Sequence, residues 1–204
     1  MRAVFLDKDG TLIEDVPYNV DPGRIRLTRG AEEGLRLLHA AGYALIVISN
    51  QSGVARGLFP EEALRAVERR LRGLLEEVGV PLLGFYYCPH HPEGVVPGLA
   101  VACGCRKPEP GMILRAAAEH GIELARSWFI GDILDDVEAG RRAGCSTVLI
   151  DNGHETEWVV SAARTPHEVT ADLAEAARRI VATAADGTRD VAPQGHQMRI
   201  GVHP

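Results

Sequence analysis

Lysine is nearly absent from this chain. Of 22 basic residues, 20 are arginine, and lysine occurs only at Lys8 and Lys107. Lysine carries a compact point charge, whereas the arginine guanidinium is a planar fork. In a chain that otherwise uses arginine, we therefore expect the two lysines at positions that require a point charge. The alternative is that both are there by chance.

Excess positive charge, long apolar segments and a dense set of cysteines are also absent. The net charge is −6, which counts against the basic surface that nucleic-acid binding requires. No apolar run approaches the about 18 residues of a membrane span, and the first one is too short for a signal peptide. We therefore expect a cytoplasmic protein without nucleic-acid or membrane partners. Its four cysteines should be free thiols or metal ligands rather than disulfides.

Strand-like apolar runs alternate with helix-like amphipathic segments along the 204 residues. This order predicts an α/β fold with a doubly wound, mostly parallel Rossmann-like sheet, helices on both faces and no large cap domain. We expect a single domain over residues 1–185 and a flexible tail over 186–204. The expected strands are 3–6, 43–48, 82–87, 127–130 and 146–150. The expected helices are 30–41, 60–78, 110–120, 134–143 and 166–184, with a loop over 89–104.

Polar side chains follow three of the predicted strands. Asp7 and Asp9 come directly after the first, Ser49 and Asn50 end the second, and Asp132 follows the strand over 127–130. The carboxyl ends of parallel strands meet at one edge of the sheet, which is where ligands bind in such folds. We therefore expect these side chains to lie together.

This set of residues suits phosphoryl transfer. Asp7 and Asp132 would form the oxygen-rich site that Mg²⁺ prefers, and a carboxylate can attack a phosphoryl group to give an aspartyl-phosphate. Asp9 lies two residues further along and can act as general acid and then as general base. Ser49, Lys107 and backbone amides can hold the phosphoryl oxygens. The sequence therefore predicts a Mg²⁺-dependent phosphatase.

Three cysteines and a histidine bracket the loop over residues 88–105. Together they are the Cys₃His set of a structural zinc site, although their one-residue gaps are tighter than the usual two to four. Buried free cysteines are the alternative, and His91 could replace the histidine. Cys145 stands apart and is expected to be a small buried side chain. The four candidate ligands are Cys88, His90, Cys103 and Cys105.

The motifs DKDGTL, SNQ, RKP and GDILDD, in this order, are similar to the four motifs of the haloacid dehalogenase superfamily. The longer stretches FLDKDGTL, SNQSGVARG, YYCPHHP and CGCRKPEPGM resemble one branch of it, the D-glycero-D-manno-heptose 1,7-bisphosphate 7-phosphatases, which are related to histidinol-phosphate phosphatases. The resemblance covers residues 3–150. It implies a haloacid dehalogenase-like fold and the hydrolysis of a small sugar phosphate on the route to nucleotide-activated heptose.

The resemblance also implies roles for individual residues. Asp7 would be the nucleophile and Asp9 the proton donor. Mg²⁺ would be held by Asp7, Asp132 and the backbone carbonyl of Asp9, while Ser49 and Lys107 would stabilise the phosphoryl group. The same four residues named above would bind zinc, with His90 favoured over its neighbour. The expected substrate contacts are Asp15, Val16, Pro17, Tyr18, Asn50, Gln51, Ser52 and Arg106.

One position departs from the family pattern. Ile133 follows Asp132 directly, where members of the family commonly carry lysine or arginine. We expect charge to hold the distal part of the substrate less strongly here, which would weaken a preference for a bisphosphate. Asp136 has the superfamily spacing and is expected to support the metal site without binding the ion. Asp135 is expected to face solvent.

Other functions fit part of the pattern. The substrate could be histidinol phosphate or another small phosphate ester, and the net charge counts against a nucleic-acid end phosphatase. A phospho-receiver signalling domain shares the sheet and an acidic Mg²⁺ site, but it should need neither the DxDGT pair nor a zinc loop. A monomer is the expected state. Basic residues 69, 70 and 72 should form a solvated helix face. The histidines expected to have no ligand-like neighbours are His39, His120, His154, His167, His196 and His203.

Overall fold

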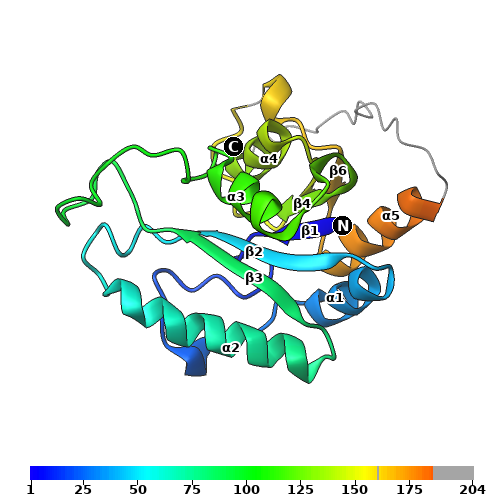
Figure 1. Ribbon diagram of the computed structural model, residues 1–204, viewed down its shortest axis with the longest axis horizontal. Coiled ribbons are helices and arrows are strands. Elements are labelled where there is room, and N and C mark those ends of the chain that lie inside the picture. The colour runs from blue at the N-terminus through cyan, green and yellow to red at the C-terminus, as the bar shows by residue number, and fades with distance from the viewer. Residues whose placement is uncertain (160, 186–204) are drawn as a thin grey trace, which may run out of the picture.

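The computed structural model describes residues 1–159 and 161–185, so the predicted tail lies outside the described residues. A six-stranded parallel sheet, in the order β3-β2-β1-β4-β5-β6, forms the centre of the molecule (Figure 1). Its strands are β1 Ala3–Leu6, β2 Ala44–Asn50, β3 Leu82–Cys88, β4 Trp128–Gly131, β5 Ser146–Ile150 and β6 Glu168–Thr170. The α-helices are α1 Ala31–Ala40, α2 Leu64–Glu77, α3 Gly111–His120, α4 Leu134–Ala143 and α5 Leu173–Ala185.

Helices cover both faces of the sheet. Val4 and Leu6 of β1 belong to the apolar cluster formed with α1, α2 and α5, whereas Ala3 and Phe5 belong to the cluster formed with α3 and α4. All four residues of β1 are completely buried. This explains why β1 is continuously apolar rather than alternating, as expected for a parallel strand that is covered on both sides. The predicted doubly wound fold is confirmed.

The last predicted helix is wrong at its beginning. Residues 168–170 form β6, which pairs with β5 at the edge of the sheet, and α5 begins only at Leu173. A reciprocal cap fixes this start: the amide of Glu175 donates to Asp172 Oδ1 (2.8 Å), and the amide of Ala171 donates to Glu175 Oε2 (3.0 Å). Asp172 caps the helix and so sets its first residue, which the spacing of apolar residues alone did not predict.

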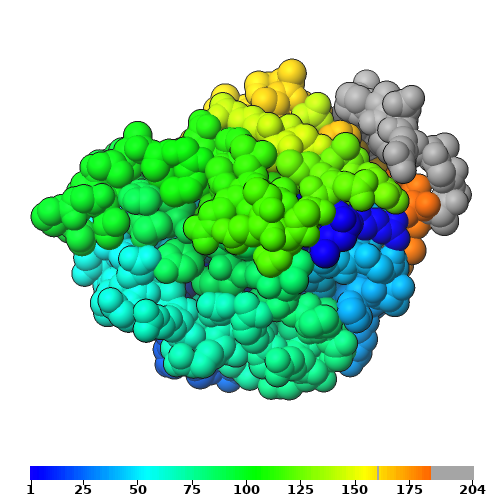
Figure 2. Space-filling model, in the orientation of Figure 1, coloured from blue at the N-terminus to red at the C-terminus, as the bar shows by residue number. Residues whose placement is uncertain are grey.

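The connection from β3 to α3, residues 89–110, contains no helix or strand. It projects from the body of the molecule on the left of Figures 1 and 2, in green. The described residues include no large cap domain over the sheet. They also include no helix with the length and apolar character that crossing a membrane requires.

Candidate active site

The end of β1 carries Asp7 into a tight turn at the carboxyl edge of the sheet. The amide of Asp7 donates to Ile130 O of β4 (2.9 Å), which extends the sheet pairing by one residue. Gly10 then has a φ of +84°, and a Cβ built on it would lie 2.0 Å from Asp132 Oδ2. Only glycine can therefore occupy position 10 while Asp132 stays where it is.

Lys107 lies at the base of the site and is 2% exposed. Its ammonium donates to Asp7 Oδ1 and to Ile48 O (3.2 Å), and it lies 2.6 Å from Asp136 Oδ1. Burial works against its charge, but the carboxylates of Asp136 and Asp7 hold the pKa of Lys107 above its ordinary value. Asp136 Oδ2 also accepts from the amide of Ile133 (3.3 Å). The two oxygens of Asp136 therefore bind Lys107 and the backbone just before α4.

Asp7, Asp132 and Asp136 each place a carboxylate oxygen within 4.8 Å of the others. Burial, and then the charges of Asp136 and Asp9, raise the pKa of Asp7 to about 7, although Lys107 acts in the opposite direction. Burial and the charge of Asp7 raise the pKa of Asp132 to about 6. One ammonium does not balance three buried carboxylates. The remaining negative charge, presented by oxygen donors, fits a hard divalent cation such as Mg²⁺.

Asp9 lies on the more open side of the site, with a side chain that is 34% exposed. Its Oδ1 is 2.6 Å from the ammonium of Lys8, and its Oδ2 accepts a longer hydrogen bond from Gln51 Nε2 (3.4 Å). The same Gln51 nitrogen donates to Ser49 Oγ (2.7 Å). The exit of β1 is thus bridged to the exit of β2, as the sequence predicted.

Asn50 holds the backbone of Lys107. Its Nδ2 donates to Lys107 O (3.2 Å), and its Oδ1 accepts from the amide of Lys107 (3.0 Å). The sequence predicted Asn50 only as a substrate contact. The structure shows that it also fixes the ion-paired lysine at the site.

Among the cavities at this edge of the sheet, two share lining residues around Asp9. The first has a volume of about 240 Å³ and is lined by Asp7, Asp9, Asp15, Asn50, Lys107, Asp132, Ile133 and His154. The second, of about 270 Å³, shares Asp9, Asp15 and Asn50 with the first. It adds Pro17, Tyr18, Gln51 and Ser52 from the predicted substrate contacts. Three predicted residues, Val16, Ser49 and Arg106, are not among the lining residues of either cavity.

Comparison with known proteins decides the family. The chain is 40% identical over 152 residues to the D-glycero-beta-D-manno-heptose-1,7-bisphosphate 7-phosphatase of Yersinia pestis, covering 74% of this chain and 81% of that protein. It is 38% identical over 157 residues to the alpha-anomer 7-phosphatase of Photorhabdus laumondii, covering 76% and 86%. The chain belongs to the heptose-1,7-bisphosphate 7-phosphatase family. It is a phosphoric monoester hydrolase.

Solved structures agree with this assignment. A HAD-like phosphatase from Mesorhizobium loti superposes with a TM-score of 0.78 and 35% identity, over 93% of this chain and 88% of that one. The D,D-heptose 1,7-bisphosphate phosphatase of B. bronchiseptica, solved with magnesium and phosphate, gives 0.71 and 29% identity, over 89% and 99%. The HAD-hydrolase-like family model matches residues 104–176.

The predicted zinc ligands lie together where β3 ends and in the loop that follows it: Cys88 is the last residue of the strand, and the other three belong to the loop. Cys105 Sγ is 3.0 Å from Cys88 Sγ and 3.2 Å from Cys103 Sγ. His90 Nδ1 is 3.4 Å from the sulfur of Cys105. His91 is turned to other partners: it accepts from the amide of Glu93 (3.1 Å), and its Nε2 is 3.2 Å from Arg56 Nη2. Three sulfurs and one nitrogen within 4.8 Å of one another are the donor set of a tetrahedral metal site.

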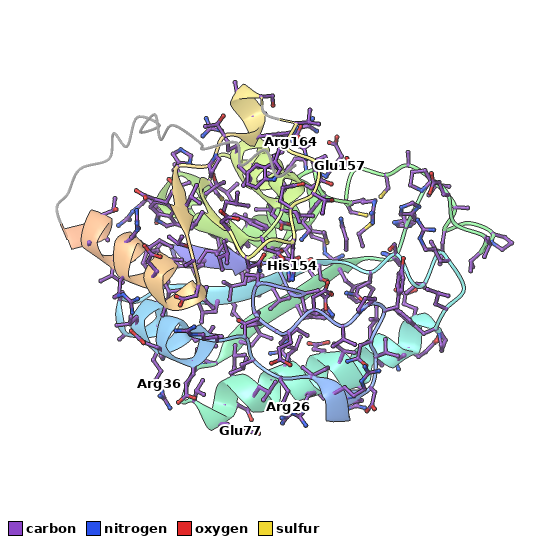
Figure 3. The ribbon with its side chains drawn as sticks, turned by 180° about the vertical axis from the view of Figure 1, so that it is seen from behind. Arg26, Arg36, Glu77, His154, Glu157 and Arg164 are labelled. Carbon is purple, nitrogen blue, oxygen red and sulfur yellow. The ribbon has the colours of Figure 1, made fainter. Side chains whose placement is uncertain are left out.

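The expectation that His154 has no ligand-like neighbours is wrong. His154 lies in the segment after β5, at the edge of the first cavity (Figure 3). Its Nδ1 is 2.6 Å from Asp132 Oδ2. The position of β5 beside β4 is the signal that could have found it, because both strands end at the same edge. The motifs themselves end before residue 150, and His154 belongs to none of them.

Of the other side chains that were expected to have no part in the site, some make side-chain contacts and some are exposed or buried as expected. Asp135 does not face solvent freely, because Arg164 Nη2 binds its Oδ1 (2.8 Å). His120 and His167 are hydrogen-bonded, to Tyr86 and to Thr147. His39 is exposed near the end of α1, and Cys145 is buried, as expected. His196 and His203 lie outside the described residues.

Proposed function

We propose that this chain removes the 7-phosphate of a D-glycero-D-manno-heptose 1,7-bisphosphate through an aspartyl-phosphate intermediate. The observation that supports this most is the position of Asp7. Asp7 directly follows β1, and its carboxylate lies at the base of a polar cavity, between Lys107 and Asp132. The chain is also about 40% identical to relatives named for this reaction. A sugar phosphate that enters the cavity would meet this carboxylate at its base.

Asp7 is the proposed nucleophile. One of its oxygens attacks the phosphorus while the bond between phosphorus and the sugar oxygen breaks. Lys107 would balance the charge on the phosphoryl oxygens, and the Ser49 hydroxyl would donate a hydrogen bond to one of them. Asp7, Asp132 and the backbone carbonyl of Asp9 would hold Mg²⁺, which when bound would neutralise the carboxylates and the phosphoryl group together. Asp136 supports the site by orienting Lys107.

Asp9 is the proposed general acid and base. It gives its proton to the leaving sugar oxygen, and it then takes a proton from the water that hydrolyses the aspartyl-phosphate and frees Asp7. Its contacts with Lys8 and Gln51 support the position that this role requires, because they hold the carboxylate beside the cavity rather than in bulk solvent.

The sugar would occupy the second cavity. Asp15, Pro17 and Tyr18 on one side and residues 50–52 on the other line it, and we propose these residues, with Val16 and Arg106, as the substrate contacts. We also propose a structural zinc ion at Cys88, His90, Cys103 and Cys105. Arg106 and Lys107 follow directly in the chain, so the ion would fix the approach of both cations to the phosphate.

Substitution of Ile133 tests how the distal part of the substrate is held. Ile133 lines the first cavity beside Asp132, at the position where relatives commonly have a cation. We expect Ile133→Lys to lower KM for a sugar bisphosphate by up to about fivefold, the size of a solvent-exposed ion pair. Ile133→Met, which lengthens the side chain without charge, should leave KM unchanged. An equal fall in KM for a monophosphate would contradict the idea.

We further propose that residues 1–185 form one domain that acts as a monomer in the cytoplasm. The continuous sheet, with apolar clusters on both faces, supports a single folding unit.

Phosphate release in Mg²⁺ tests the function. The substrates are both anomers of heptose 1,7-bisphosphate, fructose 1,6-bisphosphate and histidinol phosphate, with Asp7→Asn as the blank. We expect strong preference for one heptose anomer. Comparable slow turnover of all four would keep the phosphatase chemistry and reject the heptose substrate. Release no faster than the blank, with a stable phosphoryl adduct, would indicate a receiver-type domain.

A further inference from the structure

The segment after β5, residues 151–157, crosses the edge of the catalytic cavity as a strap. Asn152 Nδ2 donates to Gly10 O (2.8 Å), and Asn152 Oδ1 accepts from the amide of His154 (3.2 Å). The strap is therefore tied to the turn that follows Asp7. Figure 3 shows His154 on this yellow segment, near the middle of the molecule.

A second attachment joins the strap to α4. Glu155 Oε2 accepts from the amide of Leu134 (2.6 Å), the first residue of that helix. Asp132 stands two residues before this amide, so the strap caps the helix start that carries Asp132 and Asp136. The strap is therefore attached at Gly10 and at Leu134, and His154, which contacts Asp132, lies between the two attached residues of the strap.

The contact between His154 and Asp132 completes the support of that carboxylate. Asp132 Oδ1 accepts from Thr11 Oγ1 (3.3 Å), and Oδ2 lies 2.6 Å from His154 Nδ1. The Asp132 side chain is 5% exposed and that of His154 is 40% exposed, so the imidazole covers the carboxylate from the solvent side. Gly10 leaves the room for this, because a Cβ there would lie 2.4 Å from His154 Nδ1.

We propose that His154 is a positioning residue for the metal-binding carboxylate of Asp132. With its proton on Nδ1, the imidazole donates to Oδ2 and fixes the rotation of the carboxylate, so that the oxygens present their free lone pairs to the cation. Hydrogen-bond partners of metal-ligating side chains act in this way, and their loss typically costs about 10- to 100-fold in metal affinity. The inference rests on the Mg²⁺ site of the proposed function.

The side-chain geometry gives a sharp test. The amide Nδ2 of asparagine is separated from Cβ by the same number of bonds as the imidazole Nδ1, whereas alanine has no donor. We therefore expect calorimetric titration of the full chain with Mg²⁺ to show about 10- to 100-fold weaker binding for His154→Ala. His154→Asn should restore most of the affinity. Steady-state assays should show a raised KM for Mg²⁺ in His154→Ala, with kcat recovered at saturating Mg²⁺.

Two controls separate positioning from damage to the fold. Glu157→Ala changes the same strap at a side chain that makes none of these contacts, and it should bind Mg²⁺ as the wild type does. Asp132→Asn should bind none. If wild-type protein binds Mg²⁺ and His154→Ala binds it equally well or more tightly, or if asparagine fails to restore affinity, the inference is overturned. Wild-type protein that binds no Mg²⁺ overturns the proposed metal site as well.

Discussion

Asp7→Asn should abolish phosphate release and, at neutral pH, raise the melting temperature of the Mg²⁺-free protein. Loss of the nucleophile removes the covalent route, and we expect turnover to fall by at least about a thousandfold. The amide is nearly isosteric with the carboxylate, so the cavity keeps its shape. Phosphate release from the sugar bisphosphate measures the loss.

The gain in stability follows from the buried charge. Burial and neighbouring carboxylates raise the pKa of Asp7 from 3.8 to about 7. The folded chain therefore binds this proton more tightly than the unfolded chain does, and ionisation of Asp7 destabilises the metal-free fold as the pH rises from about 4 to about 7. Asparagine cannot ionise, and Lys107 keeps Asp136 as a partner. The difference in melting temperature between variant and wild type should thus grow from pH 5 to pH 8.

Asp15→Asn is the matched control for the melting experiment. It removes the same charge from an exposed side chain at the same edge of the sheet, and it should change the melting temperature little at either pH. If Asp7→Asn melts below wild type at pH 8 in Mg²⁺-free buffer, the ion pair of Asp7 with Lys107 outweighs the cost of burying the carboxylate.

His90→Ala should remove zinc from the loop after β3, whereas His91→Ala should retain it. Of these two histidines, His90 is the one that places a ring nitrogen beside the sulfurs of Cys88 and Cys105, at 3.5 and 3.4 Å. A structural zinc site contributes its binding free energy to folding, and we expect His90→Ala to lower the melting temperature by more than about 10 °C. Metal analysis of the purified variants and thermal melts measure both effects.

Activity should fall together with zinc content. Arg106 and Lys107 directly follow the predicted ligand Cys105, so loss of the metal should free the backbone that delivers the lysine to Asp7. The His91→Ala variant should melt within a few degrees of wild type and remain active. Equal zinc content in the two variants would contradict the assigned ligand, and zinc-free wild-type protein with full activity would contradict the site.

The parts of the molecule that could be predicted from the sequence are those encoded by local sequence patterns. The buried strand β1 and the polar residues at the strand ends are local patterns, and the order of a parallel sheet brings local patterns together at one edge. This was enough to place Asp7, Asn50 and Asp132 in one cavity, whereas Lys107, which ends no strand, was predicted from the RKP motif. Short spacings also brought the four predicted zinc ligands together at the end of β3 and in the loop that follows it.

Contacts that depend on the path of irregular backbone could not be predicted from local sequence patterns. β6 has three residues, too few to show a period, and it became visible only through its pairing with β5. His154 reaches Asp132 because a loop without repeating pattern folds back over Gly10. Asn50 could be predicted to face the site, but the reciprocal bonds to the backbone of Lys107 depend on the path of a connection 57 residues further along the chain.

The scarcity of lysine has a consequence for chemical labelling. Lys8 and Lys107, the only lysines of the chain, are each 2% exposed, and both ammonium groups are paired with carboxylates of the site. An amine-selective reagent therefore finds no accessible ε-amine on the folded protein, although 20 arginines keep the chain rich in positive charge. Mass added at either lysine thus reports that the carboxyl edge of the sheet has opened, so the protein carries a built-in chemical reporter of its own site.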